Sequence, residues 1–322
     1  MTTTTNAYVA SLPMVLTEVE VSHVERVSPS YVRLELGGSG LAECGRSGPL
    51  LDQRMKIVFP NAAGALPSFA GMDSSWWDTW LAIPEDERGS IRTYTVRDLV
   101  GSGVDTRIVV DVVVHDPDEH SGPGNDWALQ ASVGDRVIVL APRLGHEFGG
   151  IEWSPGSASR LLLVGDETAV PAIRGILRDL PDDASGAAFL EVPFADDVQR
   201  DVVAPDGVEI TWIPRGDAMR GASLHAAVVA WLTGAAAAAP TVGDDEVDPD
   251  LWETPVYSSS GEEVAAATQV PADTPHAGLY AWIAGESKVV TGLRRRLVNE
   301  LGVDRGQVAF MGYWREGVAM RS

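Results

Sequence analysis

A run of side chains between positions 92 and 97 combines the chemical groups that bind a flat, phosphate-bearing ligand. The run reads Arg92-Thr93-Tyr94-Thr95-Val96-Arg97. Strand-like alternation places Arg92, Tyr94 and Val96 on one face and the other three on the opposite face. A guanidinium pairs with a diphosphate, a phenol stacks on a planar ring, and a hydroxyl or a backbone N–H bonds a ring nitrogen. The set suits a flavin dinucleotide, although the same residues also make an ordinary amphipathic strand.

A glycine-rich turn follows at Gly122-Pro123-Gly124-Asn125-Asp126-Trp127-Ala128, shortly after a predicted strand that ends at His115. Glycines let the backbone approach a ligand closely, and the N–H groups at the start of a short helix predicted over 127–131 are donors for a phosphate. The turn therefore predicts a cradle for a pyrophosphate. The alternatives are a plain connecting loop and, for His115, a histidine that only ends its strand.

A second candidate nucleotide site is Gly165-Asp166-Glu167-Thr168-Ala169-Val170-Pro171-Ala172, directly after the apolar strand 161–164. A strand, a tight turn and a helix start are the parts of such a site, with Thr168 as the expected N-cap and Pro171 in the first helical turn. The turn is not Gly-x-Gly-x-x-Gly. Because Asp166 and Glu167 themselves complement the helix dipole, a charged helix cap is the alternative.

The next strand ends at Glu191, where an acid would bond the ribose hydroxyls of a pyridine nucleotide. A 2'-phosphate would need Arg200, Arg215 or another base nearby, so the sequence leaves NADH and NADPH both open. The last candidate segment is Gly312-Tyr313-Trp314-Arg315-Glu316-Gly317, after the final strand. Its aromatic pair is expected beside the cofactors or, alternatively, as packing for the C-terminus.

The elements that must position the first two segments are short strands. Alternation and turn residues predict strands at 15–21, 31–36, 55–59, 91–96, 107–114 and 136–140. Strands without helices between them favour a closed or nearly closed antiparallel barrel. The stretch from Phe69 to Trp80 interrupts them with Trp76, Trp77 and Trp80. It is either a loop or short helix whose indoles pack against the barrel, or a lid over a bound aromatic ligand.

The second half of the chain alternates strands with helices. We expect strands at 161–164, 187–192, 208–213, 279–284 and 307–311, and helices at 168–180, 224–232 and 288–301. Such units build a doubly wound parallel sheet. The prediction is thus an α+β two-domain chain, with an antiparallel β-barrel over residues 12–153 and an α/β domain over 158–322. Residues 235–277, rich in alanine and acids, are expected to be a surface insertion that Trp252 and Tyr257 hold in place.

Composition excludes several classes of function. The chain has 24 Lys and Arg against 46 Asp and Glu, a formal charge of −22, so nucleic acid and membrane are poor partners. Any phosphate must therefore be bound by a local set of donors. Cys44 is the single cysteine, and the six histidines have no metal-ligand spacing, so we expect neither a disulfide nor a metal site. Without a basic leader or a long apolar run, the expected location is the cytoplasm.

Taken in order, these segments resemble the siderophore-interacting protein family, flavin-dependent ferric-siderophore reductases of the ferredoxin-reductase-like group. The likeness covers residues 14–322 apart from the insertion. It is carried by Arg92-x-Tyr94-Thr95-x-Arg97, the segment 115–128, Gly165-Asp166-Glu167-Thr168-Ala169-x-Pro171-Ala172, Trp282-x-Ala284-Gly285-Glu286 and Gly312-Tyr313-Trp314-Arg315-x-Gly317. The family's turn usually reads Gly-Pro-Ala-Ser, whereas this chain has Gly122-Pro123-Gly124-Asn125.

The resemblance implies a barrel that binds FAD and a second domain that binds NADPH or NADH as electron donor. The residues implied at the flavin are Arg92, Thr93, Tyr94, Thr95, Val114, His115, Gly122, Pro123, Gly124, Asn125, Trp127 and Ala128. Those implied at the nicotinamide nucleotide are Asp166, Glu167, Thr168, Ala169 and Trp314. Lys56 matches a basic position that faces the iron chelate. With Arg97 and Arg315 it forms our candidate set for attracting an anionic chelate.

The function expected from this likeness is hydride transfer from NAD(P)H to FAD, followed by single-electron reduction of Fe(III) held by a siderophore. No protein ligand to iron is required, because the small-molecule siderophore holds the metal. Two alternatives stay open: a flavin reductase that passes electrons to a protein acceptor, and a siderophore-binding module without redox activity. The sequence does not identify the siderophore or the oligomeric state.

Overall fold

The computed structural model describes residues 12–69, 75–115, 122–234, 252–254, 257–258 and 276–317. They form two compact units that divide between Ile151 and Glu152. Within these ranges, no helix is long and apolar enough to cross a membrane. The insertion predicted over 235–277 falls mostly outside the described residues. Its described part includes two short strands, β11 (Trp252–Thr254) and β12 (Tyr257–Ser258).

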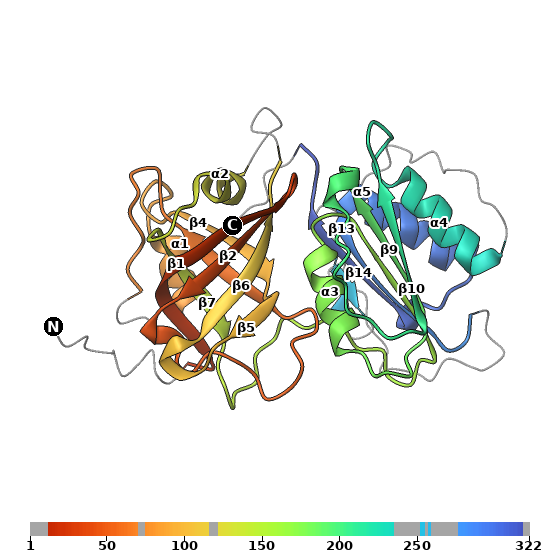
Figure 1. Cartoon of the computed structure of the whole chain (residues 1–322), viewed down its shortest axis with the longest axis horizontal. Coiled ribbons are helices and arrows are strands. Elements are labelled where there is room, and N and C mark those ends of the chain that lie inside the picture. Colours follow the sequence, from red (N-terminus) through yellow and green to blue (C-terminus); the bar gives the residue numbers. More distant parts are fainter. Residues whose placement is uncertain are drawn as a thin grey trace. The chain divides into compact units, whose positions relative to one another are not determined.

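The first unit is a single antiparallel sheet of seven strands that curls on itself (Figure 1). Its strands are β1 (Met14–Ser28), β2 (Tyr31–Gly37), β3 (Arg54–Phe59), β4 (Ser90–Thr95), β5 (Asp98–Val100), β6 (Arg107–Val113) and β7 (Arg136–Pro142). Their spatial order is β4-β3-β7-β1-β2-β6-β5. The two edge strands, β4 and β5, follow each other in the chain. Val96 N donates to Gln53 O and Arg97 N to Val109 O at their junction, which brings the edges together and closes the barrel.

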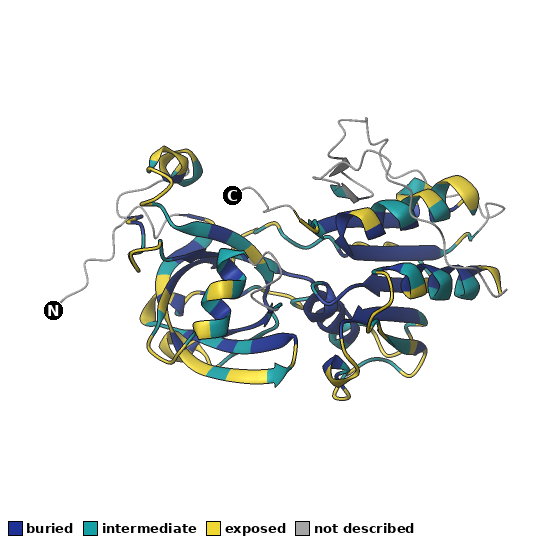
Figure 2. Cartoon of the chain, turned by 90° about the horizontal axis from the view of Figure 1, so that it is seen from above, coloured by how far each residue is buried: buried dark blue, intermediate teal, exposed yellow. Residues whose placement is uncertain are grey.

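The inner face of this sheet is filled by a core, and part of its outer face is covered by a helix. Alternate residues such as Leu34, Ile57 and Val110 point inward and form the main core, which appears as the dark-blue inner face in Figure 2. The opposite set, including Val58 and Ile91, forms a second cluster beneath helix α1 (Trp76–Ala82). Helix α2 (Pro123–Gln130) contacts β3, β4 and β6. The tryptophan stretch is therefore a short helix packed on the outer wall, as one of the two sequence interpretations expected.

The second unit is a doubly wound parallel sheet. Its parallel strands, in the order β10-β9-β8-β13-β14, are β8 (Arg160–Gly165), β9 (Gly186–Val192), β10 (Val208–Pro214), β13 (Leu279–Glu286) and β14 (Val308–Trp314). The helices are α3 (Val170–Asp179), α4 (Ala222–Thr233) and α5 (Ser287–Arg294). The strand order reverses between β8 and β13, and ligands bind sheets of this kind at the carboxyl ends beside such a switch point.

Helices cover both faces of this sheet because its central strands are buried on both sides. Leu162 and Val164 point to the face covered by α4 and α5. Gly165 points to the other face, where an added Cβ would lie 2.4 Å from the Cβ of Ala169, so glycine is required for α3 to pack this closely on β8. The antiparallel strand β11 extends the sheet beside β14, and the Trp252 ring stacks on Tyr313 at 5.9 Å.

The helix predicted over 288–301 is confirmed; it is α-helical to Arg294 and continues as a π-helical segment, Arg295–Glu300. The predicted start of another helix is wrong. Helix α3 starts later than expected, with Ala169 at the N-cap, so Thr168 is not the cap. The physical reason is that the Asp166 carboxylate accepts from both the backbone N and the hydroxyl of Thr168, which holds this segment in a turn before the helix.

Candidate functional site

The flavin residues predicted on β4 point to two different faces of the barrel wall. Tyr94 pairs with Met55 and Arg92 with Ile57, and both partners belong to the inner core. Residues directly opposite each other in a sheet point to the same face. Arg92 and Tyr94 therefore share the inner face, whereas Thr93 pairs with Lys56 on the outer face. The Arg92 guanidinium donates to the carbonyl of Ile91 at 2.7 Å.

Burial controls the protonation of this pair. It raises the pKa of the Tyr94 phenol well above its ordinary value, a shift that the charge of Arg92 only partly offsets. The phenol therefore stays neutral and keeps its O–H as a donor. Burial also lowers the pKa of Arg92, but a guanidinium remains cationic at neutral pH. The inner face thus holds one cation and one flat aromatic ring side by side.

The glycine-rich turn begins α2 and lies on this ring. Gly122 is the N-cap, and an added Cβ there would meet no atom within 4 Å. Gly124 is buried, and a Cβ on it would lie 2.3 Å from the Tyr94 hydroxyl oxygen. The side-chain oxygen Oδ1 of Asn125 accepts a hydrogen bond from the backbone N of His115 at 2.7 Å, which connects the turn to the end of β6. The fold thus brings Tyr94, the turn and His115 together.

Aromatic packing fixes α2 in place. The Trp127 ring lies 5.1 Å from Phe59, and Phe59 packs edge-on against Tyr94 at 6.0 Å. Ala128 is buried in the core, as is the side chain of Val114, so these two predicted flavin residues reach a ligand only through their backbone. Thr95 is buried at the end of β4.

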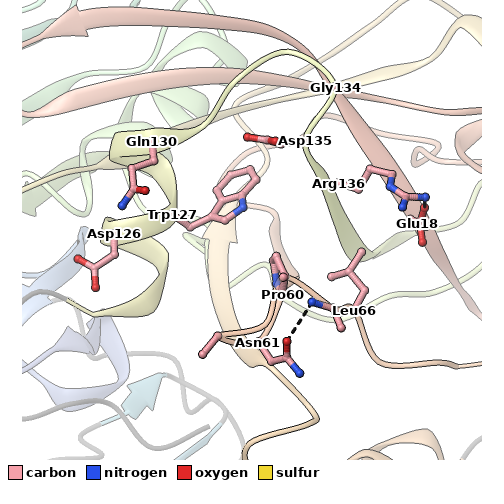
Figure 3. Close-up of a pocket in the computed structure, with 13 residues that line it drawn as sticks. Glu18, Pro60, Asn61, Leu66, Asp126, Trp127, Gln130, Gly134, Asp135 and Arg136 are labelled. Atoms are coloured by element: carbon pink, nitrogen blue, oxygen red, sulfur yellow. Dashed lines mark hydrogen bonds and ion pairs between the residues drawn. The ribbon is translucent and has the colours of Figure 1, made fainter.

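A cavity of about 850 Å³ lies on the side of α2, between this helix and the segment after β3 (Figure 3). Its lining residues are Glu18, Pro60, Asn61, Ala62, Gly64, Ala65, Leu66, Asp126, Trp127, Gln130, Gly134, Asp135 and Arg136. Trp127 is the one predicted flavin residue among them. No sequence motif indicates this cavity, because its walls come from four separate segments.

The three cations proposed for the substrate differ in their surroundings. Lys56 lies on the outer barrel face, where its Nζ is 3.2 Å from the Thr93 hydroxyl. Arg97 lies 3.8 Å from Asp111, a buried carboxylate that also forms a two-pronged ion pair with Arg33. Arg315 follows β14 in the second unit. Arg97 thus has a structural ion pair with Asp111, whereas Lys56 is hydrogen-bonded to the Thr93 hydroxyl.

In the second unit, Asp166 is the hub of a buried network at the carboxyl ends of the strands. Its carboxylate accepts from Thr168, from the backbone N of Glu286 at 2.7 Å and from the Trp314 indole Nε1 at 2.8 Å. Gly285 leaves room for it, because an added Cβ would lie 2.7 Å from the carboxyl carbon. Burial raises the pKa of Asp166 to about 6, and neighbouring Glu167 adds to the shift.

The remaining acids at this edge also have internal partners. Glu167 pairs with Arg220 at 2.7 Å and with Arg215 at 3.5 Å. Glu191 accepts from the backbone N of Gly221 and pairs with Arg215 at 3.3 Å. Glu191 is 1% exposed, so its carboxylate is not presented to ribose hydroxyls as the sequence interpretation expected. Neither acid lies in the first turn of α3, which has no side-chain cap, so the charged-cap alternative does not describe them.

Trp314, like Thr168, is a predicted cofactor residue that this network leaves half-buried. Its indole is fixed by Asp166, its backbone oxygen accepts from the Ser287 hydroxyl at 2.9 Å, and the Arg220 guanidinium lies 4.6 Å from its ring. Sequence reasoning missed Arg220 and the role of Glu286, which accepts from the backbone N of Lys288 and caps α5. The sequence motif that ends in Gly285-Glu286 could have indicated the role of Glu286.

Two family models match the chain. The model described as a siderophore-interacting FAD-binding domain matches residues 20–146, and the model described as a siderophore-interacting protein matches residues 158–317. Together they cover both units and confirm the prediction of an FAD-binding barrel. The second match supports the predicted role of the parallel sheet in the same family.

Named relatives cover nearly the whole chain. The ferric vibriobactin reductase ViuB of Vibrio cholerae is 28% identical over 294 residues, which is 90% of this chain and 86% of the relative. The NADPH-dependent ferric-chelate reductase of Escherichia coli is 27% identical over 300 residues, 92% of each chain.

Solved structures agree with these matches. A siderophore utilization protein from T. fusca is 30% identical, has a TM-score of 0.64, and aligns over 96% of this chain and 95% of its own. The ferredoxin reductase of carbazole 1,9a-dioxygenase, at 16% identity and a TM-score of 0.54, covers 94% of this chain and 71% of its own. It shares the fold alone and confirms the predicted ferredoxin-reductase-like architecture. With its barrel and its parallel sheet each matched by a model of the family, this chain belongs to the siderophore-interacting proteins.

Proposed function

We propose that the protein reduces ferric siderophores, with NAD(P)H as the electron donor and FAD as the resident cofactor. The observation that carries this proposal is the packing of the glycine-rich turn on Tyr94, with Arg92 on the same face of β4. The relatives named as a ferric vibriobactin reductase and a ferric-chelate reductase support the choice of substrate.

The residues present fit FAD. The Arg92 guanidinium would pair with the diphosphate, and the neutral Tyr94 phenol would provide a flat wall for the ring system. Gly122 begins α2 without a side-chain cap and with open space around it, so the N–H groups of the first turn remain approachable. Asn125 uses its side-chain carbonyl oxygen to hold His115 and donates from its amide to the Asp126 carboxylate at 3.4 Å, and its second amide hydrogen would be the donor toward a phosphate.

FAD, when bound, accepts two electrons as a hydride equivalent and gives them up one at a time. The balance is therefore one NAD(P)H consumed and one proton released for every two Fe(III) centres reduced to Fe(II). Hard oxygen ligands hold Fe(II) more weakly than Fe(III), so reduction loosens the metal from the chelate. In the second unit, the buried acids orient Trp314 and the two arginines rather than contacting the nucleotide themselves.

Anaerobic mixing of the FAD-loaded protein with NADH or NADPH tests the first half of the proposal. We expect loss of the oxidised flavin absorbance with at least one nucleotide, and its return when a ferric chelate is added. No bleaching with either nucleotide would favour a siderophore-binding module. Bleaching that a protein acceptor reverses, and that no ferric chelate reverses, would favour a flavin reductase.

The substrate cations are tested with the double variant Lys56→Ala/Arg315→Ala. We expect slower reduction of an anionic ferric chelate at matched flavin content, because two positive charges are removed from a strongly acidic protein. Asp182→Ala, an exposed change in the second unit, is the control. An unchanged rate in the double variant would remove these residues from the substrate site.

A further inference from the structure

Two arginines lie at the carboxyl ends of the parallel strands, and their surroundings differ. Arg215 follows β10, where its backbone N donates to the carbonyl of Val192 at 2.7 Å. Its guanidinium lies 3.5 Å from Glu167 and 3.3 Å from Glu191, two carboxylates that are 0% and 1% exposed. If this cation moved away, both acids would lose a partner inside the protein, which costs free energy. Arg215 is therefore a structural cation.

Arg220 has different neighbours. Its Nη1 pairs with Glu167 at 2.7 Å, and its guanidinium carbon lies 4.6 Å from the centroid of the half-buried Trp314 ring. Its Nε is buried and makes no hydrogen bond to any residue that the structure describes. Buried donors without an acceptor are rare in folded proteins, because the lost hydration is not replaced. A ligand oxygen that accepts from this guanidinium would replace it.

The loop that carries Arg220 is held in one conformation by the residue that follows. Gly221 has a φ of +78°, and its backbone N donates to both carboxylate oxygens of Glu191, at 3.0 and 3.1 Å. Glu191 thus fixes the backbone beside Arg220, while Glu167 and Trp314 fix its guanidinium. A side chain ordered in this way loses little further conformational entropy when a ligand binds to it.

The contacts of Arg220 place its guanidinium at the switch point of the sheet. Glu167 lies in the turn between β8 and α3, and Trp314 ends β14. Strand β13 lies between β8 and β14 in the sheet. In sheets of this kind the diphosphate of a dinucleotide lies at the turn after the first strand, and the adenosine ribose extends toward the end of the second strand. Those strands are β8 and β9 here, so Arg220 lies on the diphosphate side.

We propose that Arg220 binds the diphosphate of the pyridine nucleotide while its guanidinium stays stacked on the Trp314 indole. The inference rests on the proposed function and names the residue that recognises the electron donor in the second unit. Stacking on a ring leaves the edge of the planar guanidinium available for two parallel hydrogen bonds to phosphate oxygens. In a chain with a formal charge of −22, a phosphate needs such a local cation. The contact provides binding only, and no bond forms or breaks there.

Binding of unreactive ligands tests this contact without turnover. The dissociation constants of NAD⁺, NADP⁺ and ADP-ribose for the FAD-loaded protein are measured by calorimetry. All three contain the diphosphate, only NADP⁺ has a 2'-phosphate, and ADP-ribose lacks the nicotinamide. Arg220→Gln removes the charge, whereas Arg220→Lys keeps a cation beside Glu167 and so protects the fold. Arg296→Gln removes one positive charge that pairs with Glu300 in the same unit and is the matched control.

We expect Arg220→Gln to weaken all three ligands equally, by about 10–100-fold, the loss typical of a charge-assisted contact. Arg220→Lys should weaken them by about fivefold, because an ammonium cannot form the two parallel bonds. Arg296→Gln should stay within about twofold of the wild type. Thermal unfolding and flavin content should match the wild type in every variant that is compared.

Three outcomes overturn the contact: wild-type constants in either Arg220 variant, a loss confined to NADP⁺, which would place Arg220 at the 2'-phosphate, and no binding of any ligand to the wild type. If the constants shift as expected while neither NADH nor NADPH bleaches the flavin, the contact stands and the proposed reductase function fails.

Discussion

The turn at 122–125 in the barrel and the turn at 165–168 in the parallel sheet both precede a helix, but their polar groups have different partners. In the barrel, Gly122 is open and the helix N-terminus has no side-chain cap. In the sheet, Asp166 accepts from four donors and Glu167 pairs with two arginines. The barrel turn keeps groups available for a ligand, whereas the sheet turn uses them to hold its own chain together.

This difference shows what a strand-turn-helix pattern does not reveal. Carboxylates at a helix start compete with a bound anion for the same N–H donors. When distant residues such as Arg220 and Trp314 converge on those carboxylates, the turn becomes a structural junction. Ligand contact in the second unit then depends on the residues that the junction orients.

Asp166→Ala should destabilise the second unit by about 3–5 kcal/mol, because it leaves buried donors from Thr168, Glu286 and Trp314 without an acceptor. Urea unfolding followed by tryptophan fluorescence measures the loss, analysed as separate transitions for the two units. The flavin content of the barrel should not change. Asp182→Ala, at an exposed position, is the control. A stability equal to wild type would mean that the network is not structural.

The same carboxyl group should make stability depend on pH. Burial raises the pKa of Asp166 from its ordinary 3.8 to about 6. Between these values the folded state keeps a proton that the unfolded state has lost, so the free energy of unfolding falls as pH rises. Between pH 3.8 and pH 6, this carboxyl group lowers the free energy of unfolding by about 3 kcal/mol. Asp166→Asn has no such proton, so denaturation curves of the variant should show a smaller decrease between pH 4 and pH 6. Parallel curves for the two proteins would contradict the assignment.

Arg92→Ala should weaken FAD binding by about 10–100-fold, the loss typical of a charge-assisted contact to a phosphate. Fluorescence titration of the flavin-free protein with FAD measures this constant. Arg107→Ala, which removes a half-exposed arginine that pairs with Glu35 elsewhere in the barrel, is the matched control. If the two variants bind FAD equally well, Arg92 does not contact the cofactor.

The smallest effects are expected from replacing one glycine in each unit by alanine. Gly122→Ala should change the free energy of unfolding by less than about 0.5 kcal/mol, since its Cβ meets open space, and should still weaken FAD binding by a few fold. Gly221→Ala should cost about 1–3 kcal/mol, because Gly221 has a φ of +78° and its Cβ would lie 2.7 Å from Val289. The reverse ranking in thermal unfolding would contradict the contrast between an open turn and a packed one.

Sequence reasoning located the strands, predicted a barrel followed by a parallel sheet, and identified the turn at Gly122. These features follow from alternation and local residue types. It did not find the partners of Asp166, because Glu286 and Trp314 lie 120 and 148 positions away in the chain. It assigned the N-cap to Thr168, whose groups bond Asp166 instead. It also assigned Arg97 and Lys56 the same substrate role, because the ion pair between Arg97 and Asp111 depends on how the barrel closes.

Strand β13 enters the sheet far from the Asp166 network. It starts at Leu279, opposite Arg160, and Ala284 near its other end lies opposite Gly165. A strand of this length spans roughly 25 Å. A fluorescent reporter or an affinity handle attached at Ala277, which is exposed just before β13, should therefore report on this protein without altering its turnover.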